Sequence, residues 1–232
     1  LVGLVILHYI KRQLQLELLG EVPVLSIRTE PLQNPVNRLA KRLFDLTFSS
    51  LFLLTIFPFI YLIVGLIIKI TSPGPIFFKQ ERNGENGKIF KCYKFRSMKV
   101  NALSDSLQAT KNDPRKTKFG NFLRKSNLDE LPQFINVFKG EMSIVGPRPH
   151  MLKHTEEYSQ LINKYMMRHL VKPGITGWAQ VTGYRGETKE LSQMEGRVRR
   201  DLWYIENWTF LLDIRIMIKT VTNMFRGEKN AY

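Results

Sequence analysis

Apolar side chains are unevenly distributed along the chain, and residues 46–68 contain no charged residue at all. At about 1.5 Å per residue this run would be roughly 34 Å long as a helix, which is enough to cross a bilayer. Pro58 lies near its middle, where a proline removes a backbone hydrogen bond and kinks a helix. Basic residues flank both ends, with Lys41 and Arg42 before the run and Lys69 after it.

The two basic flanks favour the same side of a membrane, because positive charge is normally retained on the cytoplasmic side. A helix that enters the bilayer, bends at Pro58 and returns satisfies both observations. We therefore predict a re-entrant membrane helix, broken at Pro58, over residues 37–70. A straight transmembrane helix that tolerates the proline stays open as an alternative. A wholly buried core helix is disfavoured by the length of the run.

After residue 70 the pattern becomes that of a basic, water-soluble domain. The segments PIFFKQ and IFKCYKFRSM predict two strands, and ERNGENGK between them carries turn signals, so we expect a β-hairpin. Helical patterns follow around residues 119–124, 128–138, 155–170 and 196–225. Ahead of the apolar run, HYIKRQLQLELLG reads as a charged helical stretch and VPVLSIRTE as a short strand. The whole pattern predicts a helix-rich α+β fold.

The charge balance narrows the choice of partner. The chain holds 35 Lys and Arg against 20 Asp and Glu, a net charge of +15, which indicates nucleic acid, anionic lipid or a phosphate-rich substrate. A nucleic-acid-binding protein does not explain the uncharged run, and no nucleic-acid module is recognisable. Cys92 is the single cysteine, which excludes an internal disulfide and fits a reducing, cytoplasmic-facing location.

The stretch SNLDELPQF places two adjacent carboxylates, Asp129 and Glu130, inside this basic chain. Ser126 or Asn127 would cap a helix that begins at about Asp129, since Pro132 is tolerated only near a helix start. Adjacent helical residues point about 100° apart, so one carboxylate could attack a substrate while the other binds a metal. The alternative is structural, because acids are common in the first turn of a helix.

Two later stretches offer ligand-binding groups. In MSIVGPRPH, Pro147 and Pro149 hold Arg148 in a stiff, extended presentation that suits bidentate phosphate binding, unless Arg148 is a solvated surface residue. KPGITGWAQVTGYRGET combines four glycines with Tyr184 and Arg185, which suits a mobile loop that closes over a ligand.

Taken in order, several blocks of the sequence closely resemble one family, the bacterial sugar transferases, which are monotopic polyprenyl-phosphate phosphoglycosyl transferases. The resemblance covers about residues 37–222, and its long, undecaprenyl-phosphate glucose or galactose phosphotransferase-like form is the nearest. The blocks are KRLFDLTFSS, SPGPIFFKQERNG, YKFRSM, NDPRKTKFGNFLRKSNLDELPQFINVFKGEMSIVGPRPH, KPGITGWAQVTGYRGE and DLWYIENWTFLLDI.

The resemblance implies an activity at the bacterial inner membrane, with the active site on its cytoplasmic face. Such enzymes move a sugar 1-phosphate from a UDP-sugar onto undecaprenyl phosphate and release UMP, by way of a covalent aspartyl phospho-sugar. They initiate the assembly of exopolysaccharide, capsule or O-antigen. We expect Mg²⁺ as cofactor, inner-membrane lipids as partners, no nucleic acid, and a homodimer. UDP-glucose or UDP-galactose is the expected donor.

The resemblance also implies residue roles. Asp129 matches the nucleophile, Glu130 the residue that assists it, and both would bind Mg²⁺. Pro58 matches the proline of the membrane break, where the family often has Ser-Pro and this chain has Phe57-Pro58. Lys41 and Arg42 match the basic pair at the membrane entrance. The residues expected to bind substrate or phosphate are Lys94, Arg96, Arg124, Pro147, Arg148, Pro149 and Arg185.

Three regions are expected on this basis. Residues 1–36 would be the tail of an N-terminal domain with its linker, and residues 37–70 the re-entrant helix. Residues 71–232 would form a cytoplasmic catalytic domain with interfacial helices, in which Trp203 and Trp208 lie near the headgroups. Two further alternatives stay open: a membrane scaffold without activity, and a glycosyltransferase that passes sugar without phosphate and releases UDP.

Overall fold

The computed structural model describes residues 14–19, 22–27, 30–100, 113–186, 188 and 190–226. The strands β1 (Leu14–Leu19) and β2 (Val22–Ile27) form an antiparallel pair. β2 confirms the strand predicted in VPVLSIRTE. β1 corrects the helical stretch predicted in HYIKRQLQLELLG, because LQLELL alternates apolar and polar residues with the period of a strand. The earlier part of that stretch lies outside the described residues.

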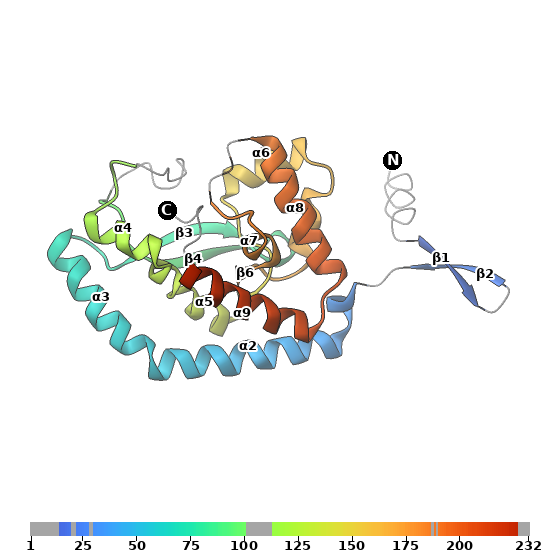
Figure 1. Cartoon of the computed structure of the whole chain (residues 1–232), viewed down its shortest axis with the longest axis horizontal. Coiled ribbons are helices and arrows are strands. Elements are labelled where there is room, and N and C mark those ends of the chain that lie inside the picture. The colour runs from blue at the N-terminus through green and yellow to red at the C-terminus, as the bar shows by residue number, and fades with distance from the viewer. Residues whose placement is uncertain are drawn as a thin grey trace.

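A long helix pair follows, consisting of α2 (Pro35–Thr55) and α3 (Phe57–Thr71), and it bends by 56° (Figure 1). The side chain of Asn34 caps α2 by accepting a hydrogen bond from Val36 N at 2.9 Å. In the part of the chain that the structure describes, no single helix is long and apolar enough to cross a membrane. The bent pair meets that test only when its two helices are counted together.

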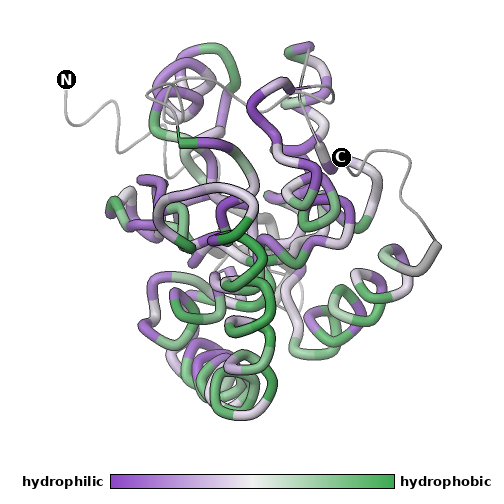
Figure 2. Tube along the Cα trace, turned by 90° about the vertical axis from the view of Figure 1, so that its left-hand side faces the viewer, coloured by the Kyte–Doolittle hydropathy of each residue, from purple (hydrophilic) through white to green (hydrophobic). Residues whose placement is uncertain are grey.

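The bend lies where the sequence predicts it. Pro58 is the second residue of α3, so the missing N–H and the ring of the proline interrupt the helix after Ile56. The straight-helix alternative is therefore wrong. The core-helix alternative is wrong as well, because Leu54 and Phe59, on either side of the bend, are 79% and 69% exposed. Figure 2 shows α3 as hydrophobic along most of its length.

α2 is docked on the rest of the protein by a buried polar stripe. Lys41, Asp45 and Ser49 follow one another at a spacing of four, which places them on one face of the helix. The Lys41 ammonium forms an ion pair with the buried Asp213 of α9 (Phe210–Arg226). Lys41 is only 8% exposed, so the residue expected at the membrane entrance is committed to an internal partner.

The predicted β-hairpin is confirmed. β3 (Phe77–Asn83) and β4 (Ile89–Phe95) pair antiparallel and are joined by the 3-10 turn η2 (Glu85–Gly87). A third two-stranded sheet, not predicted, pairs β5 (Ser143–Val145) in parallel with β6 (Gly174–Thr176). Asp45 of α2 accepts a hydrogen bond from Ile144 N of β5 at 3.0 Å, so the stripe on α2 also fixes this small sheet.

The other elements are helices, most of them short. In chain order they are η1 (Pro31–Gln33), α4 (Lys118–Lys125), η3 (Leu128–Glu130), α5 (Gln133–Lys139), α6 (Leu152–Leu161), η4 (Tyr165–Leu170), α7 (Trp178–Val181), α8 (Leu191–Glu206) and α9. α4 confirms the helix predicted around residues 119–124.

Three predicted helices are each divided in two. Residues 128–138 break at Pro132, which stands at the N-cap of α5. Residues 155–170 break at Lys164, whose φ of 67° lies in the left-handed region and ends helical geometry. Between α8 and α9 lies Trp208, which is 5% exposed and donates to Asp213 Oδ2 at 3.1 Å. Trp208 therefore belongs to the core and does not face a membrane interface, whereas Trp203 is 40% exposed.

The buried pair on α2 predicts an asymmetry in stability. Asp213→Asn leaves the Lys41 ammonium buried without its counter-charge, which costs about 3–5 kcal/mol. For a chain of this size we expect the melting temperature in detergent to fall by roughly 10 °C.

The matched control is Glu85→Gln, which removes the partner of Arg38 in a pair whose arginine side chain is 56% exposed. That pair is worth at most about 1 kcal/mol, so the melting temperature should change by only a few degrees. Equal losses in the two variants, measured by differential scanning fluorimetry, would contradict the docking role of Lys41.

Candidate active site

The acidic pair lies in η3, a single 3-10 turn between α4 and α5. Asp129 and Glu130 are 6% and 7% exposed, so both carboxylates are buried. Asn127, just before the turn, has a φ of 59° and makes no side-chain cap. The prediction that Ser126 or Asn127 caps a helix starting at Asp129 is therefore wrong. Pro132 delays the helix, so the acids lie outside the first turn of α5.

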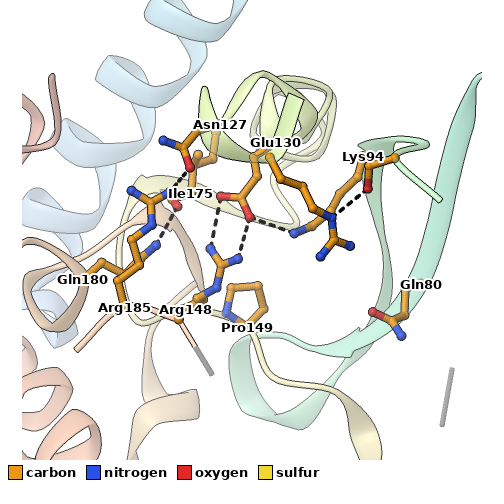
Figure 3. Close-up of polar contacts among 12 residues, drawn as sticks. Gln80, Lys94, Asn127, Glu130, Arg148, Pro149, Ile175, Gln180 and Arg185 are labelled. Carbon is orange, nitrogen blue, oxygen red and sulfur yellow. Dashed lines mark hydrogen bonds and ion pairs between the residues drawn. The ribbon is translucent and has the colours of Figure 1, made fainter. Parts of the chain in front are cut away.

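Glu130 is held by two cations from distant segments (Figure 3). Lys94 Nζ of β4 donates to Glu130 Oε1 at 2.7 Å. The Arg148 guanidinium donates to the same carboxylate through two nitrogens, at 2.5 and 3.1 Å. Burial acts to raise the pKa of Glu130, but Arg148 and Lys94 together hold it well below its ordinary value. Glu130 is therefore an anion at neutral pH.

Asp129 has the opposite character. Its carboxylate makes no hydrogen bond or ion pair with any other residue that the structure describes. Burial raises the pKa of Asp129 to about 6; the Lys94 ammonium opposes this rise and the Glu130 carboxylate adds to it. Both oxygens of Asp129 keep their lone pairs for an incoming group, and at neutral pH the carboxylate is mostly ionised.

Arg148 is held through its backbone as well as through its guanidinium. Pro147 and Pro149 bracket it, as predicted, in the loop that follows β5. Its backbone carbonyl accepts a hydrogen bond from Arg168 of η4 at 2.8 Å, and Arg168 Nε pairs with the buried Asp201 at 2.8 Å. Arg168 and Asp201 were not predicted from the sequence. They lie 33 positions apart, and no local pattern links them.

Two other predicted cations lie at the acidic pair. Arg124, in the last turn of α4, donates from Nε to Ser97 Oγ at 2.8 Å, and its charge acts to lower the pKa of Asp129. Arg185, in the loop after α7, donates to the side-chain oxygen of Asn127 (Figure 3). The structure therefore brings Lys94, Arg124, Arg148 and Arg185 together around one turn.

Arg96 is not brought to this group. Its guanidinium donates to the backbone carbonyls of Ser72 and Pro73, at 2.8 Å for the latter, and braces the turn that follows α3. Pro58 lies in the bend between α2 and α3, as predicted, and belongs to the helix pair.

The sequence was compared with known protein families and proteins. A protein-family model described as "Bacterial sugar transferase" matches residues 36–227. The chain belongs to the bacterial sugar transferase family. It is 54% identical over 221 residues to a protein of Escherichia coli (strain K12) named "UDP-glucose:undecaprenyl-phosphate glucose-1-phosphate transferase", covering 94% of this chain and 47% of that one. A protein of the same name from Xanthomonas campestris pv. campestris is 49% identical over 223 residues, covering 93% and 45%.

A shorter relative is matched almost throughout. The "Exopolysaccharide production protein PSS" of Rhizobium leguminosarum bv. phaseoli is 45% identical over 194 residues, which are 81% of this chain and 96% of that protein. This bacterial sugar transferase chain thus spans about half the length of the Escherichia and Xanthomonas relatives and nearly all of the Rhizobium one.

The carboxylates of this bacterial sugar transferase also limit the kind of metal site. Within the described residues no group of three or more His, Cys, Asp or Glu side chains could hold a metal ion. Mg²⁺ is commonly bound by one or two carboxylates together with substrate phosphates and water. Asp129 and Glu130 fit that arrangement, and they do not fit an ion enclosed by protein ligands alone.

The isolation of Asp129 predicts an unusual titration. In protein labelled with ¹³C at aspartate carboxyls, one carboxyl resonance should titrate with a midpoint near pH 6 and be missing in Asp129→Asn. A midpoint near the ordinary value of 3.8 would show that water solvates Asp129 and would contradict its burial.

Glu130→Gln provides the second half of that test. The substitution removes a neighbouring negative charge and leaves the charges of Lys94 and Arg148 uncompensated beside Asp129. Both changes favour the ionised form, so the Asp129 pKa should fall in this variant. An Asp129 midpoint that does not move, or that rises, would contradict the coupling between the two carboxylates.

Proposed function

We propose that this chain transfers a sugar 1-phosphate from a UDP-sugar to undecaprenyl phosphate and releases UMP, with UDP-glucose as the donor. The observation that carries the proposal is the buried carboxylate of Asp129, which bonds no other described residue and lies amid four cations, in a chain of the bacterial sugar transferase family. The names of the Escherichia and Xanthomonas relatives support this donor and acceptor.

In the first step an oxygen of the Asp129 carboxylate attacks the sugar-side phosphorus of the diphosphate. A new P–O bond forms to Asp129, the P–O bond to the uridine-side phosphate breaks, and its electron pair leaves with UMP. No proton has to move, because Asp129 is mostly ionised above its pKa of about 6. Coulomb repulsion opposes the approach of one anion to another, and Lys94, Arg124 and Arg148 offset it.

In the second step an oxygen of undecaprenyl phosphate attacks the same phosphorus. The bond to Asp129 breaks, and the carboxylate leaves as the anion it was before the first step. The covalent intermediate divides one transfer between two bulky substrates into two smaller ones. It also lets UMP leave before the lipid phosphate enters, so both anions can use the same cations in turn.

Glu130 serves these steps through the cations that it holds. Its low pKa makes it a poor proton acceptor at neutral pH, so its part is to fix Lys94 and Arg148 beside Asp129. Bound Mg²⁺ would be held by Asp129 and Glu130 with substrate phosphates, and would supply further positive charge at the diphosphate oxygens.

We further propose that α2 and α3 form a re-entrant pair in the cytoplasmic leaflet of the bacterial inner membrane, with the active site facing the cytoplasm. Apolar residues around the bend are widely exposed, among them Leu51 at 62%, Leu54 at 79% and Leu62 at 67%. Burying such a surface in lipid is favourable by about 25 cal/mol per Å². A product anchored in this membrane fits the start of exopolysaccharide assembly, and the name of the Rhizobium relative supports that role.

The released nucleotide tests the reaction. Purified protein given Mg²⁺, undecaprenyl phosphate and UDP-glucose should release UMP, and without the lipid it should gain the mass of one hexose phosphate. Asp129→Asn should lose both signals, with a rate loss on the order of 10³-fold or more, because it removes the nucleophile. Glu156→Gln, an exposed acid on α6, is the matched control and should behave as wild type.

Other products would decide against the proposal. Release of UDP would make the protein a glycosyltransferase that transfers sugar without phosphate. UMP release from another UDP-sugar alone would replace UDP-glucose as the donor. An absence of turnover with every UDP-sugar, in protein that melts normally, would favour the scaffold alternative.

Cysteine labelling tests the membrane arrangement. Gln33→Cys and Lys69→Cys are exposed positions beside the two ends of the helix pair, and Ile56→Cys lies at the bend. In inside-out vesicles a membrane-impermeant maleimide should label both end positions and leave the bend position unlabelled. Cys92 gives little background, because it is 2% exposed and burial raises the pKa of its thiol. Labelling of the two ends from opposite sides would contradict a re-entrant pair.

A further inference from the structure

The loop that carries Arg185 is built to turn sharply. Gly183 and Gly186 have φ angles of +95° and +100°, a region that residues with a side chain rarely adopt. They bracket Tyr184 and Arg185, so the two side chains are presented by a short segment with a glycine at each end. Such a segment needs contacts elsewhere to hold one conformation, and α8 provides them.

Arg197 of α8 holds the backbone on both sides of Arg185. Its Nε donates to the carbonyl of Tyr184 at 3.1 Å and its Nη2 donates to the carbonyl of Gly186 at 2.9 Å. Arg197 is 6% exposed, and burial, together with the charges of Arg168 and Arg148, lowers its pKa to about 10. It therefore stays charged at neutral pH, although its hydrogen bonds go to neutral carbonyls.

The Tyr184 side chain is seated on the same helix. The Arg200 guanidinium lies 3.9 Å from the centroid of the Tyr184 ring, which is a cation–π distance. Gly196, one turn earlier, leaves room for the ring: a Cβ atom there would stand 2.2 Å from Tyr184 Cε1. Gly196, Arg197 and Arg200 together form a seat on α8 for the loop, and we call these three residues the α8 seat.

The seated loop delivers Arg185 to the acidic pair. Its guanidinium donates to the side-chain oxygen of Asn127, which immediately precedes η3, and its charge acts to lower the pKa of Glu130. Asn127 is a neutral acceptor, whereas Arg148 is tied to the anionic Glu130 by two bonds. Transferring a guanidinium from an amide oxygen to a phosphate gains a charge-assisted bond.

We propose that Arg197 is a positioning residue: through the α8 seat it fixes the loop so that Arg185 can move from Asn127 onto the diphosphate of the sugar nucleotide. This inference rests on the proposed function. Arg197 itself does not touch the reacting atoms, and it acts only by placing Arg185. The loop therefore belongs to binding and positioning of the nucleotide, and the lipid phosphate does not depend on it.

A double-mutant cycle tests this dependence. Arg197→Gln and Arg185→Gln should each lower kcat/KM for UDP-glucose by roughly 10–100-fold, as expected when a positioning contact is lost. The double variant should be no worse than Arg185→Gln alone, because Arg197 acts only through Arg185. KM for UDP-glucose should rise in Arg197→Gln, while KM for undecaprenyl phosphate stays unchanged. Arg199→Gln, exposed on the same helix, is the matched control and should resemble wild type.

Gly196→Ala separates positioning from stability. The new methyl group forces the Tyr184 ring to move, yet alanine favours a helix over glycine, so the melting temperature should not fall. We expect kcat/KM for UDP-glucose to fall in this variant as in Arg197→Gln. This result decides the question if Arg197→Gln does not fold.

The failures of the two proposals are distinguishable. If wild type and Arg199→Gln release no UMP, the proposed function is wrong. If UMP is released but the losses from Arg197→Gln and Arg185→Gln multiply, or Gly196→Ala has full activity, the proposed function stands and the positioning role of Arg197 is overturned. Equal rises in KM for both substrates would also overturn it.

Discussion

A carboxylate buried as deeply as that of Glu130 is stable only where cations surround it, and this constraint organises the site. The ion cluster joins β4 through Lys94, η3 through Glu130 and the loop after β5 through Arg148, three segments that are far apart in the sequence. Removing either cation leaves the buried charge of Glu130 less well compensated. The backbone of Arg148 is in turn held by Arg168, so the cluster also fixes how the sheet of β5 and β6 meets η4.

The same constraint explains why two neighbouring carboxylates differ so strongly. Lys94 and Arg148 donate hydrogen bonds to Glu130. The neighbouring Asp129 interacts with these cations only by Coulomb attraction, without a hydrogen bond. Burial without a bonded partner raises the pKa of Asp129, while bonded cations lower that of Glu130. A nucleophile must have free lone pairs, so the proposed division of labour follows from which carboxylate receives the bonds.

The sequence predicts local features well and distant pairings poorly. Pro58 disrupts the hydrogen bonding of a helix that continues through it, and the hairpin follows from turn residues between two apolar segments, so both were predictable. Lys94 and Arg96 are two positions apart, so they would share one face of a strand. However, β4 ends at Phe95, and Arg96 donates instead to backbone carbonyls in the turn after α3. The partner of Lys41 is 172 positions away, and no spacing rule reveals it. The 3-10 turn at Asp129 was missed because Pro132 was expected inside the first turn of a helix, whereas it stands at the N-cap of α5, which begins only at Gln133.

The site thus combines cations held in two different ways. Arg148 is fixed between two prolines. Its carbonyl accepts a hydrogen bond from Arg168, and its guanidinium donates to Glu130. Arg185 lies on a segment between two glycines and bonds a neutral amide. In the proposed reaction two anionic substrates meet the same carboxylate in turn, and the two arrangements suit different parts of it. The fixed cation stabilises charge that is present in both steps, whereas a cation on a loop can bind the nucleotide and withdraw with it. Because Arg185 bonds a neutral amide oxygen, its move onto a phosphate gains a charge-assisted bond, and this bond is lost again when UMP leaves.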